Sequence, residues 1–127
     1  MFIDCDPDTL NLKSNGKWIT CYIELPKGYD VTQIDGSTIS LNGIPVYLGK
    51  EGWAKGKATE SNIMDHDNDG ILERMVKFER EKVQKILEPE ENAELIINGK
   101  VFYHQRLTDF EGRDTIRVIN KNNGKIK

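Results

Sequence analysis

The sequence predicts an all-β sandwich of about seven or eight short strands with one short helix. Apolar and polar residues alternate along most of the chain, which is the pattern of half-buried strands. Turn signals recur about every eight to twelve residues, and only one segment changes to a helical period. These observations favour two packed sheets over a βαβ fold, and a closed barrel is the alternative.

The longest alternation predicts a strand in residues 17–25, KWITCYIEL. The side chains that we expect to face inward are those of Ile19, Cys21, Ile23 and Leu25. A shorter strand, DTLNL, precedes it, and the link between the two contains Asn15-Gly16. Asn-Gly is the strongest short hairpin signal because both residues tolerate positive φ. We therefore expect residues 9–25 to form a hairpin.

Two further strand pairs are expected around Asn-Gly dipeptides. STISLNGIPVYL predicts two short strands around Asn42-Gly43, and NAELIINGKVFYH predicts two strands around Asn98-Gly99. The polar, glycine-containing segment GKEGWAKGKATESN is expected to be a loop in which Trp53 packs down as an anchor.

The remaining elements are two strands and the helix. ERMVKFER and the last part of TDFEGRDTIRVIN alternate like strands, whereas EREKVQKILEP has a helical period over about two turns and ends at Pro89. The residues expected to face inward in these elements are Val76, Phe78, Val83, Ile86, Leu87, Ile116 and Val118. We expect residues 121–127 to form a frayed tail.

Composition and charge limit the classes of protein. The chain has 127 residues, 37% hydrophobic and 31% charged, so we expect one soluble domain spanning residues 1–127. A net charge of −3 argues against nucleic acid as a partner, because nucleic-acid readers show a basic stripe. No apolar run approaches the roughly 18 residues of a membrane span. MFIDCDPDTL lacks the features of a signal peptide, so the protein is either intracellular or has lost a leader.

Two cysteines are too few for a disulfide-rich scaffold. Cys5 and Cys21 both lie in strand-like stretches that could be neighbours in a sheet. The sequence leaves two interpretations open, a disulfide between them and two small buried residues.

The segment IMDHDNDGILERM predicts a calcium loop. Calcium prefers six to eight oxygen ligands, and carboxylates at alternate residues before a sharp turn can supply them. Gly70 permits that turn without a Cβ clash, and Ile71 is expected to offer its carbonyl while its side chain points into the core. The predicted ligands are Asp65, Asp67, Asp69, Ile71 and Glu73.

The same segment does not fit an EF-hand. The twelfth position of the loop is Val76 instead of a bidentate glutamate, no amphipathic helix precedes Asp65, and a strand follows Gly70. The pattern D-x-D-x-D-G-x-x-[DE] is typical of calcium loops that join two strands. The alternatives are a solvated acidic turn and another divalent ion. Zinc is disfavoured because no second histidine or cysteine follows His66 at ligand spacing.

A second acidic group occurs near the N-terminus, where IDCDPD places Asp4, Asp6 and Asp8 at alternate positions. No glycine follows, and Pro7 favours extended backbone before it. We interpret this group as a strand start with outward carboxylates. The alternative is a second cation site, or a share in the first.

Signals for catalysis are weak, and we expect no enzyme. Only His66 and His104 could act as histidine bases, and a thiol at Cys21 facing the core would be inert. Aromatic residues could instead stack on sugars, which makes a carbohydrate- or protein-binding module the alternative function. These aromatics are Trp18, Tyr22, Tyr47, Trp53 and Tyr103.

Three segments in order along the chain resemble a known module. Residues 6–31, the loop DHDNDGILERMVKF and residues 110–119 are similar to a calcium-binding, immunoglobulin-like or cohesin-like β-sandwich of archaeal and bacterial proteins, many of them exported or surface-associated. In this module Glu73 stands where aspartate is more common. Arg74 stands where an apolar residue is usual, which leaves the inward register of its strand open.

The resemblance implies an immunoglobulin-like sandwich with bound Ca²⁺ and no enzymatic activity. We therefore expect a noncatalytic structural or adhesion-type module of a surface or secreted protein. A cohesin-like module would take a protein partner such as a dockerin-like segment.

Overall fold

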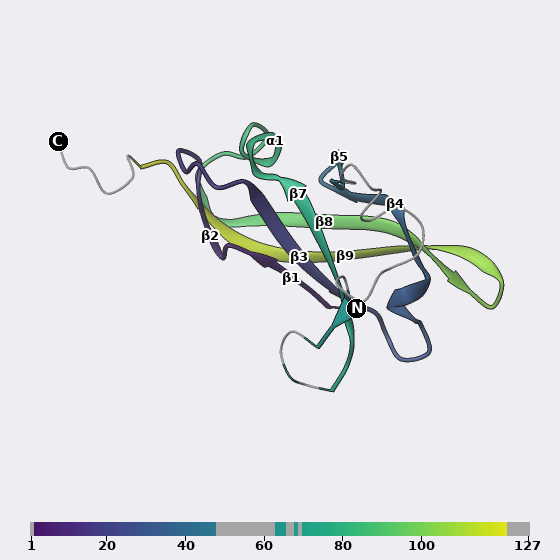
Figure 1. The fold of residues 1–127 in the computed structure, drawn as a ribbon. Coiled ribbons are helices and arrows are strands. Elements are labelled where there is room, and N and C mark those ends of the chain that lie inside the picture. The colour runs from purple at the N-terminus through teal and green to yellow at the C-terminus, as the bar shows by residue number, and fades with distance from the viewer. Residues whose placement is uncertain (1, 48–62, 66–67, 69, 122–127) are drawn as a thin grey trace.

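The computed structural model describes residues 2–47, 63–65, 68 and 70–121, which form two β-sheets, one α-helix and one 3-10 turn (Figure 1). The first sheet, in spatial order, consists of β1 (Phe2–Asp6), β3 (Trp18–Glu24), β7 (Glu73–Glu79) and β6 (Ile63–Met64). The second consists of β2 (Thr9–Asn11), β9 (Arg106–Ile119), β8 (Glu90–Tyr103), β4 (Ile34–Leu41) and β5 (Ile44–Pro45). The predicted all-β class is confirmed.

One apolar core lies between the sheets. Burial alternates along β3, and the inward set predicted from the sequence is confirmed because Ile19, Cys21 and Ile23 are at most 1% exposed. Both sheets contribute to the same buried cluster, with Val76 and Phe78 from one and Ile116 and Val118 from the other among its members. The two sheets are therefore held together mainly by burial of apolar surface.

The helix is shorter than predicted. α1 spans only Arg80–Gln84, and of its predicted apolar face Val83 is buried and Leu87 partly buried, whereas Ile86 is 49% exposed. A single buried side chain in α1 gives too little packing to extend the helix through Ile86. In the described part of the chain, no helix has the length and apolar character needed to cross a membrane.

A buried arginine connects the two sheets. Arg74 is fully buried and alternates with Val76 and Phe78, so the inward register of β7 holds in spite of the charge. Its Nη1 donates hydrogen bonds of 3.2 Å to the carbonyl oxygens of Val31 and Ile34. These acceptors belong to the 3-10 turn η1 (Val31–Gln33) and the start of β4. Burial lowers the pKa of the guanidinium, and the nearby Asp35 partly opposes this shift.

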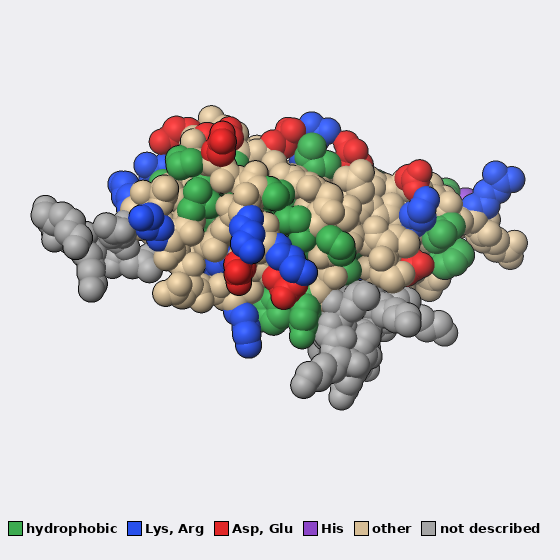
Figure 2. All heavy atoms as spheres, turned by 90° about the horizontal axis from the view of Figure 1, so that it is seen from above, with side chains coloured by type: hydrophobic (Ala, Val, Ile, Leu, Met, Phe, Trp, Pro, Cys, Tyr) green, Lys and Arg blue, Asp and Glu red, His purple; other side chains and the backbone are tan. Residues whose placement is uncertain are grey.

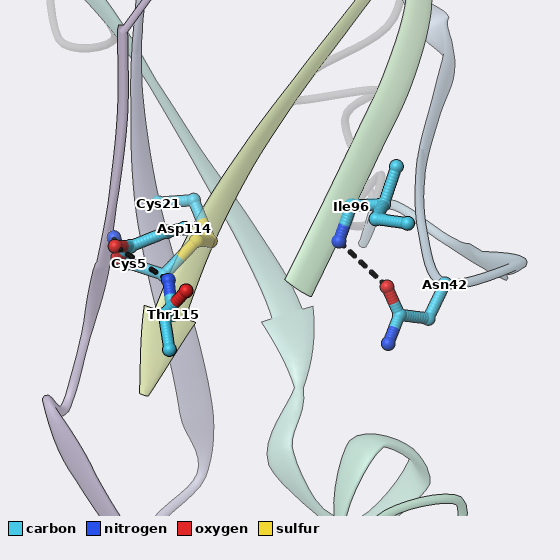
Figure 3. Close-up of a disulfide and its surroundings, with 6 residues drawn as sticks. All are labelled: Cys5, Cys21, Asn42, Ile96, Asp114 and Thr115. Atoms are coloured by element: carbon cyan, nitrogen blue, oxygen red, sulfur yellow. Dashed lines mark hydrogen bonds between the residues drawn. A yellow bond between two sulfur atoms is a disulfide. The ribbon is translucent and has the colours of Figure 1, made fainter. Parts of the chain in front are cut away.

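β1 is held on both sides, by a disulfide to β3 and, at its open edge, by a side chain of the other sheet. Cys5 faces Cys21 across β1 and β3, and the two form a disulfide, so of the two interpretations the bridge is correct (Figure 3). On the other side of β1, the backbone amide of Cys5 donates to the Asp114 carboxylate of β9 at 2.9 Å. Asp114 thus occupies an edge donor that could otherwise pair with another chain.

The predicted hairpin over residues 9–25 is wrong. β2 pairs in parallel with β9, Thr9 opposite Arg117, and therefore belongs to a different sheet from β3. Neither Asn15 nor Gly16 adopts positive φ. A Cβ on Gly16 would lie 2.5 Å from the Cζ of Arg80, so a larger residue here would displace that guanidinium from its hydrogen bonds to Trp18 and Ser14.

The other two Asn-Gly dipeptides differ from each other. Asn42 and Gly43 have φ values of 47° and 88° and connect β4 to β5, as predicted. The side-chain oxygen of Asn42 also accepts a hydrogen bond of 2.7 Å from the backbone amide of Ile96 in β8 (Figure 3).

The Asn98-Gly99 turn is a wrong prediction because both residues lie inside β8. A Cβ on Gly99 would meet the Phe110 ring at 2.6 Å, which explains the glycine. The actual turn between β8 and β9 uses His104 and Gln105, with φ values of 50° and 65°.

The surface carries both signs of charge. On the face shown in Figure 2, acidic and basic side chains are interspersed. Ion pairs join Lys100 to Asp109 at 2.6 Å and Arg113 to Glu94 at 3.1 Å, with all four side chains largely exposed. Such pairs contribute at most about 1 kcal/mol each to the stability of the protein. The apolar core and the buried hydrogen bonds of Arg74 therefore stabilise the fold more than these pairs do.

We expect Arg74→Ala to lower the free energy of unfolding by about 3 kcal/mol or more, because it leaves a cavity and removes a donor from two main-chain carbonyls. Urea unfolding followed by circular dichroism measures this change. Arg74→Met is the matched variant, since it restores most of the volume and should recover part of the loss. A cost below about 1 kcal/mol for the alanine variant would contradict the role of Arg74 in the core.

Reduction of the disulfide should lower the free energy of unfolding by about 3 kcal/mol, because the bridge closes a loop between residues 16 positions apart. Thermal melts with and without dithiothreitol test this expectation. The control is the double variant Cys5→Ala/Cys21→Ala, which should melt like the reduced protein and ignore the reductant. The expectation fails if the parent protein ignores the reductant after reduction has been verified by mass.

Candidate functional site

The predicted calcium loop lies between two paired strands. β6 and β7 are antiparallel, with Met64 opposite Glu73, so residues 65–72 close a hairpin. The expectation that strands flank this loop on both sides is confirmed. Asp65 and Glu73 consequently stand at the two ends of the hairpin loop, near its base.

The described part of the loop turns as expected at its glycine. Gly70 has a φ of 85° and Asn68 a φ of 60°, so two of its residues are left-handed. The Gly70 amide donates to the Asp65 carboxylate at 2.8 Å, which draws the beginning and the end of the turn together. The Ile71 side chain is 49% exposed, so its predicted orientation into the core is wrong. Ile71 lies before β7, which begins at Glu73, so the inward alternation of that strand does not extend to it.

The structure tests the predicted ligand set only in part. Glu73 is 1% exposed, and Asp65 is half-buried. His66, Asp67 and Asp69 lie outside the described residues, so their roles stay predictions. The same is true of Trp53 and of the tail beyond residue 121.

A second acidic group lies on β1 and directly after it. Asp4, Asp6 and Asp8 each place a carboxylate oxygen within 4.8 Å of the others, an arrangement that could hold a metal ion. Asp4 and Asp6 are half-buried and Asp8 is exposed. Asp4 and Asp6 belong to β1, Asp6 as its last residue, and Asp8 follows the strand, so the prediction of a strand start with outward carboxylates is only partly correct. The three carboxylates converge, as the alternative interpretation required.

Tyr22 lies between the two acidic groups. It stands opposite Asp4 on one side and Met75 on the other, in the middle of the first sheet. Burial raises the pKa of Tyr22, and the negative charges of Asp6, Asp4 and Glu73 raise it further. Both acidic groups therefore act on one side chain, and a bound cation near either would oppose this shift.

A third candidate site is aromatic. The rings of Trp18 and Tyr47 lie 4.5 Å apart at 54°, and the Lys77 ammonium lies 5.6 Å from the Trp18 ring centre. They border a hollow of about 400 Å³ that Glu79 and Glu81 also line. The sequence did not predict that these two glutamates would lie beside Trp18. The only signal in the sequence was the period change after β7, which brings the first turn of α1 next to the strand end.

The other candidate residues are dispersed. Tyr103 stacks on Tyr29 with ring centres 4.1 Å apart, and His104 packs edge-on against Tyr103 in the exposed turn of β8 and β9. The Cys21 sulfur is part of the disulfide and offers no thiol. These aromatics and His104 therefore do not converge with Trp18 or Tyr47.

Comparisons with protein-family models, with curated proteins and with solved structures found no match to this chain. The functional argument consequently depends on the site geometry and on the sequence pattern of the loop.

We expect Gly70→Ala to cost about 1–2 kcal/mol of unfolding free energy, because alanine at a φ of 85° is strained although no atom of the described residues lies within 4 Å of its Cβ. Gly70→Asn is the matched variant and should cost less, since asparagine tolerates left-handed backbone. Equilibrium unfolding in urea measures both changes. Equal stability of all three proteins would show that this turn is not held in the left-handed conformation.

Proposed function

We propose that this chain is a noncatalytic, calcium-stabilised β-sandwich module of a surface or secreted protein. The observation that carries the proposal is the loop between β6 and β7, where the pattern D-x-D-x-D-G-x-x-E closes a hairpin. Asp65 already bonds to the Gly70 amide, and Glu73 is buried at the first residue of β7. Carboxylates from both ends of one tight loop are the hard oxygen donors that calcium prefers.

Calcium would act as a staple. The predicted ligands are the carboxylates of Asp65, Asp67, Asp69 and Glu73 with the carbonyl of Ile71. Because like charges repel, these carboxylates favour the compact loop only when a cation neutralises them. An ion that binds only the folded form adds RT ln(1 + [Ca]/Kd), about 2.7 kcal/mol at a hundredfold excess over Kd. Extracellular modules often bind at about 10⁻⁴–10⁻³ M, which suits a staple better than a sensor.

We further propose an immunoglobulin-like or cohesin-like arrangement of the two sheets and a location outside the cell. A four-stranded and a five-stranded sheet sharing one core support the first statement. The buried Cys5–Cys21 bridge supports the second, because disulfides persist mainly in oxidising compartments.

Thermal melting in calcium and in excess EDTA tests the staple. We expect EDTA to lower the melting temperature by several degrees and added calcium to restore it, because the loop carboxylates repel one another without a cation. Asp67→Asn and Asp69→Asn should abolish this response, whereas Asp109→Asn, an exposed aspartate paired with Lys100, should respond like the parent.

Two results would count against the proposal. Identical melts in calcium and in EDTA would exclude a calcium staple. If the response survives Asp67→Asn and Asp69→Asn but is lost in the triple variant Asp4→Asn/Asp6→Asn/Asp8→Asn, the ion binds on β1 and the loop assignment is overturned.

A further inference from the structure

The hollow beside Trp18 is built by four separate parts of the chain. Its lining residues are Asn15, Gly16, Lys17, Trp18, Tyr47, Glu79 and Glu81. They come from the link before β3, the start of β3, the residue pair after β5, and the junction of β7 with α1. A volume of about 400 Å³ lies within the range of about 300–1,000 Å³ that small-molecule sites occupy.

Two aromatic rings in contact with each other line the hollow, and main-chain hydrogen bonds hold the backbone of both residues. Trp18 stands opposite Glu79 in the register of β3 and β7, and its carbonyl accepts a hydrogen bond from Arg80 Nε at 3.1 Å. The Tyr47 amide donates to the Lys77 carbonyl at 2.8 Å, which holds this residue against the edge of β7. The two rings lie 4.5 Å apart with an angle of 54° between them, so they offer a continuous aromatic surface.

The link that borders the hollow is pinned by Arg80. The Arg80 backbone amide donates to the Lys17 carbonyl at 3.0 Å, and its Nη1 donates to the Ser14 hydroxyl at 3.0 Å. Gly16 packs so closely on the same guanidinium that a Cβ would clash. The link therefore has a defined position, and Asn15 stays exposed at the rim.

Three charged residues line the hollow, Lys17, Glu79 and Glu81, and both glutamates are already paired within the protein. Glu79 pairs with Lys82 at 2.8 Å, Glu81 lies 3.5 Å from Lys85, and Lys77 lies over the Trp18 ring. A cationic ligand would compete with these lysines for both the carboxylates and the ring. An anionic ligand would meet two glutamates against one lysine, Lys17, among the residues that line the hollow. The lining thus favours a neutral ligand that has an apolar face and many hydroxyl groups.

We propose that this hollow binds a neutral saccharide. The C–H face of a sugar ring packs on Trp18 and Tyr47, and its hydroxyls donate to the Glu79 and Glu81 carboxylates and bond to the Asn15 amide. The proposal does not depend on calcium at the β6–β7 loop, which lies at the opposite end of β7.

Native affinity electrophoresis tests the proposal. The folded protein is run in gels that contain one soluble polysaccharide each, namely mixed-linkage β-glucan, glucomannan, galactomannan or dextran, with polygalacturonate as the charged comparison. We expect retardation in at least one neutral gel and none in polygalacturonate, both with calcium and with EDTA. No retardation in any neutral gel, or retardation in polygalacturonate alone, would overturn the proposal.

Variants assign the binding to this hollow. Trp18→Ala and Tyr47→Ala should weaken the retardation constant by about tenfold or more, as expected for central aromatic contacts. Because these rings also pack against the sheet, Glu81→Ala is included. Its side chain is 81% exposed, so binding should fall several-fold without a change in melting temperature. Phe102→Ala, a 50% exposed aromatic in β8, should bind like the parent. Undiminished binding by both Trp18→Ala and Glu81→Ala, or an equal loss in Phe102→Ala, would contradict the assignment.

Discussion

The buried guanidinium of Arg74 is the constraint on which the arrangement of the two sheets depends. A charge inside an apolar core is costly unless it is hydrogen-bonded, and this one finds its acceptors in the carbonyls of Val31 and Ile34 in the opposite layer. The tie also fixes the register of β7. A slip by one residue would move Arg74 to the outer face and bring Glu73 or Met75 into the core, because the side-chain period of a strand is two.

The register of β7 in turn positions two of the candidate sites. With Arg74, Val76 and Phe78 inward, the outer face of the strand receives Glu73 at its first residue and Glu79 at its last. The first belongs to the predicted calcium loop that follows β6, and the last stands opposite Trp18 in the proposed saccharide hollow. Two candidate sites of different chemistry therefore depend on the register that Arg74 fixes, and one of them includes the buried carboxylate of Glu73.

The Asn-Gly dipeptides show how far local sequence signals reach. Asn42-Gly43 forms the turn that its residue types favour, whereas at Gly16 and Gly99 a Cβ would displace the side chains of Arg80 and Phe110. Close contacts of this kind depend on tertiary packing, and they cannot be predicted from a dipeptide. The converse holds at His104 and Gln105, which adopt positive φ without a glycine because the long antiparallel ladder of β8 and β9 imposes the turn.

The candidate sites also differ in whether their residues are close together in the sequence. The β6–β7 loop could be predicted because its donors lie within nine consecutive residues and the strand period is visible on its C-terminal side. The saccharide hollow could not, since it needs the pairing of Trp18 with Glu79 and the return of Tyr47 to the edge of β7. The same reasoning explains the false hairpin, because β2 pairs in parallel with the last strand, about 108 positions away along the chain. A site whose ligands are neighbours in sequence survives an error in topology, whereas a site assembled across strands exists only once the register of the core is fixed.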